Sequence, residues 1–241
     1  MHPITYFDKI YIINLPSRED RRREIAEQFQ LIGFEINASI VEMFSAVRPS
    51  GADGFPSVGA KGCFMSHLGV LKQAKLAGYS NILILEDDVD FSSDFNARIN
   101  DVVLQLKQKP WNIFYGGYAL TEDNELLLPS ALLKLVEPTM PIRTSHFIAL
   151  NRGAIVSAVD YLEAMANRLP GSPDGGPMHV DGAYSWFRRE HPDMATFICY
   201  PELGHQRPSR TDIHALKWYD KTFGFSQASQ FARKIKRYLD R

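Results

Sequence analysis

The sequence predicts an α/β fold in which a mixed, mostly parallel sheet is flanked by helices. Short runs rich in β-branched and aromatic residues alternate with longer helical runs, as in folds of this class. Several of the short runs are apolar almost throughout, which is typical of strands buried on both faces. With 241 residues, 45% of them hydrophobic, the chain can bury a sizeable core. We expect one domain over residues 1–228 and a short basic helix over residues 229–241.

The first predicted strand covers residues 9–15, with the sequence KIYIINL. Residues 16–34 follow as a helix, in which Ser17 is expected to cap the start and Asp20 to take the third helical position, as in a short capping box. Gly33 is expected to end this helix. Its apolar residues recur at helical spacing and predict the buried face; they are Ile25, Phe29 and Ile32.

The next elements lead to an acidic strand end. Residues 36–44 read as a second strand, and residues 48–59 hold five glycines or prolines, which indicates a surface loop. A helix is expected over residues 60–77, ending at Gly78. The strand NILILE follows in residues 81–86. The predicted inward residues of the helix are Phe64, Leu68 and Leu71.

The second half of the chain continues the alternation. Residues 112–117 and 146–151 predict two further strands, and the second of them runs directly into a helix over residues 153–169. Residues 195–201 predict the last strand. Residues 202–228 are expected to form irregular surface before the basic tail.

The segment NILILEDDVDF, residues 81–91, places four carboxylates in five positions directly behind a buried strand. If the backbone stays extended, Glu86 and Asp88 point to one side and Asp87 to the other. Two converging carboxylates can bind a hard divalent ion such as Mg²⁺ or Mn²⁺, which prefers oxygen ligands and often completes its shell with phosphate oxygens. Such an ion would stabilise the charge on a departing diphosphate.

Two other interpretations compete for this segment. The first is a solvated acidic turn with no ligand. The second is the phosphate-accepting receiver domain of response regulators, which also binds Mg²⁺ with acids at a strand end. That fold needs the acids on its first strand and a further aspartate about fifty residues later, where this chain has LLLPSALLKL. The receiver interpretation is therefore rejected.

Three stretches together resemble glycosyltransferase family 25, which includes bacterial lipooligosaccharide galactosyltransferases and collagen galactosyltransferases. They are YIINLPSREDRR (11–22), GAKGCFMSHLGVLKQAKLAGYSNILILEDDVDF (59–91), and HVDGAYSWF (179–187) with YPELGHQRPSRTDI (200–213). The resemblance implies a GT-A fold, which is Rossmann-like, a nucleotide-sugar donor of the UDP-galactose type, and a divalent cation. It also implies transfer to a glycan or lipid-linked saccharide, with inversion at the anomeric carbon.

By this resemblance, EDD is the family's version of the DxD motif. Glu86 and Asp88 would lie near the metal and the donor phosphates, and Asp87 near the ribose or the sugar. Asp90 could replace one of them. A late histidine often completes the metal shell in such enzymes, which makes His205 the third candidate ligand. Family members usually carry a glutamine near this point, here Gln206.

The segment INLPSREDRR resembles the family's first nucleotide-binding loop. Asn14 at the strand end can hydrogen-bond a base or ribose. Arg18 and Arg22 are four residues apart near a helix N-terminus, where an anion is favoured. The alternative is that the arginines solvate a surface helix, and this is what we expect for Arg21 and Arg23.

The segment GCFMSH is a hallmark of the same family. Ser66 and His67 are expected to support the donor site, although a buried structural histidine is the alternative for His67. Cys63 is most simply a small core residue. Lys61 either meets a phosphate or is exposed.

An inverting transferase needs a carboxylate that takes the proton from the attacking hydroxyl. Asp181 is the predicted base, because it lies on a different segment from the metal ligands, where a Gly/Pro-rich stretch passes into an aromatic-rich helix. That stretch could act as a lid. The alternatives are that Asp181 caps the helix and that Asp174 is the base.

Composition sets the remaining expectations. The net charge of −1 gives no field for nucleic acid, and two cysteines are too few for a disulfide framework. The N-terminus lacks a signal-peptide pattern, so a cytoplasmic protein is expected. The basic residues 229–241 would either pack on the domain or rest on anionic lipid at the inner membrane surface.

The alternative function is a catalytically inactive GT-A module that binds a sugar or a protein.

Overall fold

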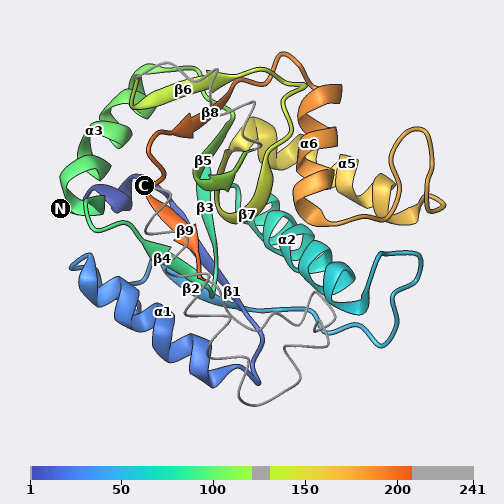
Figure 1. Ribbon diagram of the computed structural model, residues 1–241, viewed down its shortest axis with the longest axis horizontal. Helices are drawn as coiled ribbons and strands as arrows, with labels where there is room; N and C mark the ends of the chain where they lie inside the picture. The colour runs from blue at the N-terminus through green and yellow to red at the C-terminus, as the bar shows by residue number, and fades with distance from the viewer. Residues whose placement is uncertain (1, 121–130, 208–241) are drawn as a thin grey trace, which may run out of the picture.

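The computed structural model describes residues 2–120 and 131–207, and Figure 1 shows their arrangement. The predicted tail of residues 229–241 lies outside this range. In chain order, the elements are η1 (Pro3–Tyr6), β1 (Lys9–Asn14), α1 (Glu19–Leu31), β2 (Val41–Ser45), α2 (Val58–Ala77), β3 (Asn81–Glu86), β4 (Val89–Phe91), α3 (Phe95–Gln108), β5 (Ile113–Ala119), β6 (Leu133–Val136), β7 (Arg143–Asn151), α5 (Arg152–Asn167), α6 (Val180–Glu190), β8 (Thr196–Cys199) and β9 (Gly204–Gln206).

The main sheet has seven strands in the order β2-β1-β3-β7-β5-β8-β6. β1 pairs in parallel with β2 and β3, and β5 pairs in parallel with β8. β7 runs antiparallel to both β3 and β5, and β6 runs antiparallel to β8, so five of the seven strands share one direction. A second, two-stranded sheet pairs β4 with β9. The predicted α/β fold with a mixed, mostly parallel sheet is confirmed.

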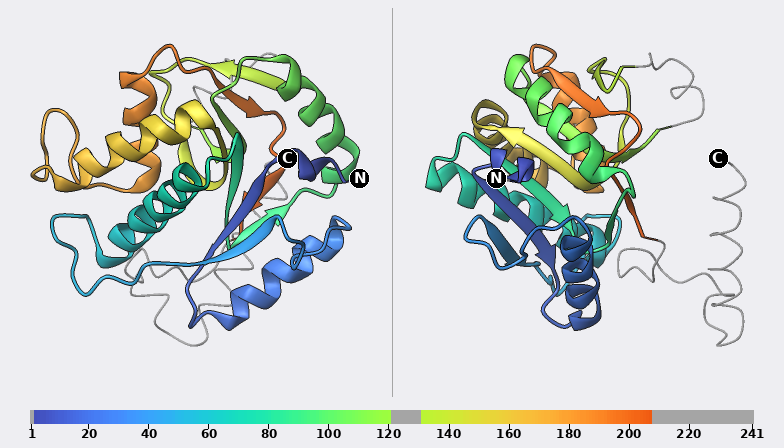
Figure 2. Two further views of the ribbon diagram at one scale, coloured as in Figure 1. Left: turned by 180° about the vertical axis from the view of Figure 1, so that it is seen from behind. Right: turned by 90° about the vertical axis from the view of Figure 1, so that its left-hand side faces the viewer.

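Helices cover both faces of the main sheet (Figures 1 and 2). Alternate residues of β3 divide between two hydrophobic clusters, because successive side chains of a strand point to opposite faces. Ile82 and Ile84 pack in a cluster with α2, α5 and α6. Leu83 and Leu85 pack in the other cluster, with α1 and α3. A strand buried on both faces explains the continuous apolar run that the sequence shows.

Several local predictions are confirmed. Gly78 ends α2 in the left-handed conformation (φ 73°), which glycine adopts without steric cost. The predicted inward residues of α1 and α2 are buried; they are Ile25, Phe29, Ile32, Phe64, Leu68 and Leu71.

Other local predictions need correction. Helix α1 begins at Glu19 with Arg18 as its N-cap, so Ser17 does not cap it. The second strand is shorter than expected, since residues 36–40 precede Val41–Ser45 in turns. Helix α3 and strands β4, β6 and β9 are absent from the sequence-based prediction, and β9 lies in a segment that was expected to be irregular. Within residues 2–120 and 131–207, no helix is both long and apolar enough to span a membrane.

Candidate functional site

A cavity of about 420 Å³ lies where β1 and β3 end, and α1, α2 and the segment after β2 complete its walls. Open α/β sheets bind ligands at this position, outside the carboxyl ends of the strands. The lining combines both signs of charge with an apolar wall. Its charged residues are Arg18, Arg21, Arg48, Glu86, Asp87 and Asp88, and its apolar residues include Ile13, Leu15, Val47, Pro49 and Val58.

The acidic segment does not stay extended. β3 ends at Glu86, residues 87 and 88 form a turn, and the N–H of Asp87 donates to the carbonyl of Ile13 at 3.2 Å. The condition for the expected division, an extended backbone from Glu86 to Asp88, is therefore not met. Asp87 and Asp88 share one partner, while Glu86 has different ones.

The shared partner is Arg21. Its Nη1 lies 2.7 Å from Oδ1 of Asp87 and 3.2 Å from Oδ2 of Asp88, and its side chain is only 12% exposed. The prediction that Arg21 solvates the surface is wrong. A signal was present in the sequence, because Arg21 lies four residues before Ile25 and so extends the buried face of α1 toward the strand ends.

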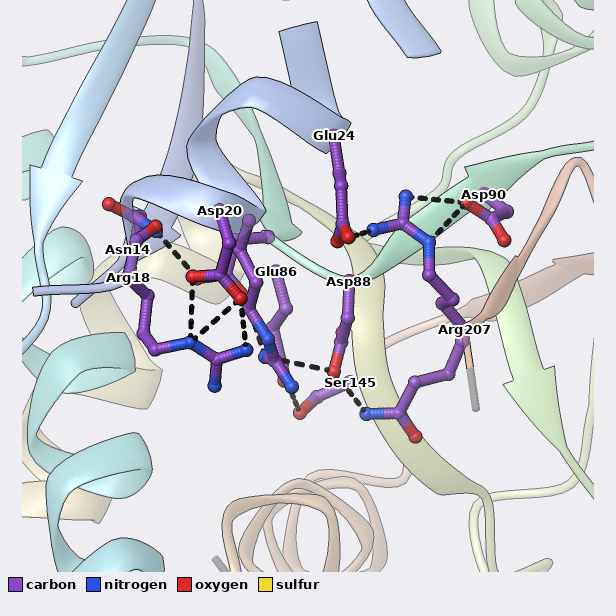
Figure 3. A network of polar contacts seen from close by, with 12 residues as sticks. Asn14, Arg18, Asp20, Glu24, Glu86, Asp88, Asp90, Ser145 and Arg207 are labelled. Atoms are coloured by element: carbon purple, nitrogen blue, oxygen red, sulfur yellow. Dashed lines mark hydrogen bonds and ion pairs between the residues drawn. The ribbon is translucent and has the colours of Figure 1, made fainter. Parts of the chain in front are cut away.

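Asn14 fixes the other side of Asp87. It is buried, and its Nδ2 donates to Oδ2 of Asp87 at 2.7 Å and to the carbonyl of Arg18 at 3.2 Å. Arg22, which is exposed, donates from Nη2 to Oδ1 of Asn14 at 3.1 Å. Arg18 itself lines the cavity and pairs with Asp20 at 2.8 Å (Figure 3). Asn14, Arg18 and Arg22 are therefore close together, and of the three only Arg18 lines the cavity.

Asp88 is the acid whose bonding is least complete. Its Oδ2 accepts from Arg21 and, at 3.3 Å, from Nε2 of Gln206, whereas its Oδ1 is buried without a hydrogen-bond partner among the described residues. Burial raises the pKa of Asp88 to about 7, and the charge of Glu86 adds to the rise. A buried carboxylate oxygen without a donor is suited to accept a cation.

Glu86 belongs to a separate network that links β3 to α2, α6 and β7. Its Oε1 accepts from Oγ of Ser145 at 2.8 Å and lies 3.3 Å from Nε2 of His67, whose Nδ1 lies 3.2 Å from the hydroxyl of Tyr184. Burial acts to raise the pKa of Glu86, but the hydrogen bond and charge of His67 and the bond from Ser145 bring it below its usual value. His67 is fully buried.

The other residues of the GCFMSH segment divide between the cavity wall and the core. Ser66 is buried, donates to the carbonyl of Gly62 at 2.6 Å and accepts the N–H of Val47 at 2.8 Å, which ties α2 to the segment after β2. Cys63 is half-buried and lines the cavity, so it is more than a core residue. Lys61 pairs with Asp53.

Asp181 lies in the first turn of α6, after the N-cap residue His179, so the alternative that Asp181 caps the helix is wrong. Its Oδ2 accepts the N–H of Thr144 at 3.1 Å, and Thr144 has a left-handed backbone (φ 64°) that β-branched residues rarely adopt. Burial raises the pKa of the Cys63 thiol, and the charge of Asp181 contributes to the rise after those of Glu86 and Asp88. Asp174, the alternative base, is exposed.

Strand β9 brings a late segment to the acids. His205 pairs with Asp90 across the two-stranded sheet, and its Nε2 lies 3.9 Å from Oδ2 of Asp90. The neighbouring Gln206 is the residue that reaches Asp88. Asp90 does not line the cavity; it accepts two bonds from Arg207, at 2.9 and 2.6 Å (Figure 3).

Sequence signals could not identify every partner in the site. Ser145 and Arg207 contact the acids from β7 and from the end of β9, and nothing in their local sequence marks them. Only the antiparallel pairing of β7 with β3 and of β9 with β4 brings them to Glu86 and Asp90.

The mixed sheet and the acid-lined cavity at its strand ends define the class of protein: an α/β fold with a cavity beside β1 and β3, where sheets of this class bind ligands. Residues 42–125 match the family described as "Glycosyltransferase family 25 (LPS biosynthesis protein)". The resemblance to glycosyltransferase family 25 that the sequence predicts is therefore confirmed.

Individual relatives agree with this match. A protein named "Probable inactive glycosyltransferase 25 family member 3" from Bos taurus is 27% identical over 168 residues, which are 61% of this chain and 28% of that protein. "Procollagen galactosyltransferase 1" from Danio rerio is 32% identical over 168 residues, with the same coverage of 61% and 28%. The chain thus spans little more than a quarter of the length of these curated relatives.

A solved structure, that of a glycosyltransferase involved in the glycosylation of the major capsid of PBCV-1, aligns with 80% of this chain and 93% of that chain. Its TM-score is 0.39 and its sequence identity is 14%. This likeness is too distant to support an argument about function.

Proposed function

We propose that the protein is a metal-dependent inverting glycosyltransferase that moves a hexose, galactose by preference, from a UDP-sugar to a glycan hydroxyl. The observation that carries this proposal is the cavity where β1 and β3 end, which three arginines and three carboxylates line together. A metal–diphosphate complex carries both signs of charge and needs both kinds of partner. An apolar wall beside the charges suits a nucleoside.

The residues present fit a divalent ion. Glu86 and Asp88 both line the cavity, and Oδ1 of Asp88 is buried without a hydrogen-bond partner among the described residues. We propose that these two carboxylates hold Mn²⁺ or Mg²⁺, which would supply Lewis-acid stabilisation of the departing diphosphate. The predicted ligand role of His205 stays a prediction. Its neighbour on β9, Gln206, contacts Asp88 directly.

The chain's own residues would bind and orient the donor. Arg18 lies at the N-terminus of α1, where the helix dipole and the guanidinium both favour a phosphate. Arg22 hydrogen-bonds Asn14, and Asn14 hydrogen-bonds Asp87. These contacts fix the position of the Asp87 carboxylate, which would meet the ribose or the sugar. Ser66 holds the wall after β2 against α2, and His67 holds Glu86.

Asp181 would take the proton from the acceptor hydroxyl. It lies on α6, whereas the acid cluster follows β3. In an inverting reaction the base would lie on the side of the anomeric carbon opposite the leaving diphosphate, so we expect it on a different element from the metal ligands. The N–H of Thr144 holds its Oδ2, so the carboxylate has a fixed direction. The acceptor would be a glycan or lipid-linked saccharide on the cytoplasmic side, and contact of residues 229–241 with a membrane stays a prediction.

A second candidate is a catalytically inactive module that keeps the fold and binds a nucleotide sugar or a partner. Relatives from Bos taurus and Homo sapiens carry the word "inactive" in their names, which favours keeping this candidate. The complete acid cluster favours the enzyme instead.

Calorimetric titration of UDP, with and without Mn²⁺, tests the donor site. Binding should require Mn²⁺ in the wild type and be lost in Asp88→Asn, but persist in Asp90→Asn, because Asp90 lies outside the cavity. Absence of UDP binding under all conditions would refute the UDP-transferase proposal. Transfer from UDP-galactose, lost in Asp181→Asn while UDP binding remains, would separate the enzyme from the inactive module.

A further inference from the structure

Glu86 has a second set of neighbours that differs chemically from Asp87 and Asp88. The sulfur of Cys63, a ring nitrogen of His67 and a carboxylate oxygen of Glu86 all lie within 4.8 Å of one another. Cys63 and His67 are four residues apart on α2 and therefore share one face of that helix. Glu86 approaches this face from the end of β3.

The three side chains are held in place by neighbours beyond them. The hydroxyl of Tyr184 lies 3.2 Å from Nδ1 of His67, and Oγ of Ser145 donates to Oε1 of Glu86 at 2.8 Å. Partners of this kind fix the orientation and tautomer of metal-binding histidines and carboxylates. Because Tyr184 engages Nδ1, the other ring nitrogen, Nε2, is directed toward Glu86.

We propose that Cys63, His67 and Glu86 form a binding site for a soft divalent ion, with Zn²⁺ as the expected occupant. Thiolate, imidazole and carboxylate are the ligand types that zinc takes, and three protein ligands with one open position are a common arrangement. Cys63 and Glu86 both line the cavity, so the ion has an entry path and the open position faces that space. Binding releases the thiol proton of Cys63 to the buffer.

The required adjustment is small. Zinc–ligand bonds of about 2.0–2.3 Å in a tetrahedral site place the ligand atoms about 3.3–3.8 Å apart. The present spacing, at most 4.8 Å, therefore needs a contraction on the order of 1 Å. Rotation of the Cys63 side chain supplies motion of this kind without moving α2.

The site would share Glu86 with the hard-ion site proposed above. Mn²⁺ and Mg²⁺ prefer the oxygens of Glu86 and Asp88, whereas Zn²⁺ gains from the sulfur and the imidazole. Occupation by zinc would withdraw Glu86 from the hard ion, so Zn²⁺ would inhibit donor binding in competition with Mn²⁺. This inhibitory consequence rests on the proposed function, but zinc binding itself does not.

Co²⁺ titration of the protein of residues 1–241 tests the site, because cobalt bound to a thiolate gives a strong near-ultraviolet charge-transfer band. The wild type should show this band at one equivalent, and added Zn²⁺ should remove it. Cys63→Ser should lose the band, whereas Cys199→Ser, which changes the only other cysteine of the chain, should keep it. Circular dichroism checks that each variant is folded.

Loss of Cys63 should also weaken zinc binding by at least ~100-fold, since loss of an outer-shell partner alone weakens it about 10- to 100-fold. Protection of Cys63 from iodoacetamide by Zn²⁺ gives a second readout that needs no variant. A band that persists in Cys63→Ser, or wild-type protein that shows neither band nor protection, would overturn the inference. Zinc binding without Mn²⁺-dependent UDP binding would refute only the proposed function; the reverse result would refute only the zinc site.

Discussion

Nη1 of Arg21 lies 2.7 Å from Oδ1 of Asp87, and the same nitrogen reaches Asp88. One guanidinium therefore neutralises part of the charge of two nearly buried carboxylates that adjoin each other in the chain. When no metal ion is bound, this contact is the one that most directly reduces the repulsion between Asp87 and Asp88.

Replacement of Arg21 tests this relationship. Arg21→Met should lower the free energy of unfolding by about 3 kcal/mol, because removal of one partner leaves buried charges unpaired. The exposed Arg23 provides the matched control, and Arg23→Met should change stability by no more than about 0.5 kcal/mol. Urea denaturation measures both values.

Mn²⁺ should stabilise Arg21→Met more than it stabilises the wild type, since a divalent ion at the acids replaces the missing positive charge. The wild-type and Arg21→Met proteins would be compared at equal ion concentration. Equal stability of the Arg21→Met and Arg23→Met proteins would show that Arg21 does not hold the acids together.

Asp88 gives the apo protein a distinctive dependence on pH. Its pKa is about 7 in the folded state against 3.8 for the ordinary carboxyl, so the folded state keeps a proton that the unfolded state releases. Stability should therefore fall as pH rises from about 4 to about 7, with a contribution of at most ~1.4 kcal/mol per pH unit. Below that range, the contribution of Asp88 is constant.

The difference between wild type and Asp88→Asn isolates this contribution, because the other titrating groups are common to both. Denaturation curves at a series of pH values, recorded with a chelator, give the two stabilities. A difference that does not change between pH 4 and pH 7 would contradict the raised pKa.

Gly117 allows β9 to approach the main sheet. A Cβ at this position would lie 2.2 Å from the carbonyl oxygen of Gly204 and 2.3 Å from Nε2 of His146. Gly117→Ala should therefore destabilise the protein by about 3 kcal/mol, as an overpacked site does. It should also weaken Mn²⁺-dependent UDP binding, because β9 carries the Gln206 that contacts Asp88.

Gly153 in α5 is the matched control, since an added Cβ would meet its nearest neighbour at 3.5 Å. Gly153→Ala should leave stability unchanged or raise it by up to ~1 kcal/mol, as alanine favours helix. Thermal denaturation of both variants measures the contrast. Similar effects of the two substitutions would argue against the close approach of β9.

The sequence predicts the site best where local pattern and chain order are sufficient. The apolar run of β3 and the acids behind it identify a strand end with charged groups, and the Gly78 terminus of α2 follows from its conformational freedom. The proximity of Asn14 to Asp87 follows from parallel neighbours whose carboxyl ends meet at one edge.

The parts that the sequence does not predict depend on contacts between distant segments. Ser145 reaches Glu86 only because β7 inserts antiparallel between β3 and β5, and no local periodicity specifies that pairing. Gln206 depends in the same way on the pairing of β9 with β4. Arg21 differs, because its helical spacing from Ile25 indicates an inward direction, which the predicted surface role of Arg21 left out of account.

The two faces of the sheet divide the acid cluster between them. Glu86 is held by His67, from the helical layer of α2, whereas Asp87 and Asp88 are held by Arg21, from the layer of α1 on the opposite face. Substitution of His67 in α2 would therefore affect Glu86, and substitution of Arg21 in α1 would affect Asp87 and Asp88. A change in α1 or α2 alone would therefore alter the site while all of its acids stay in place. In this chain both supports, Arg21 from α1 and His67 from α2, accompany the acids.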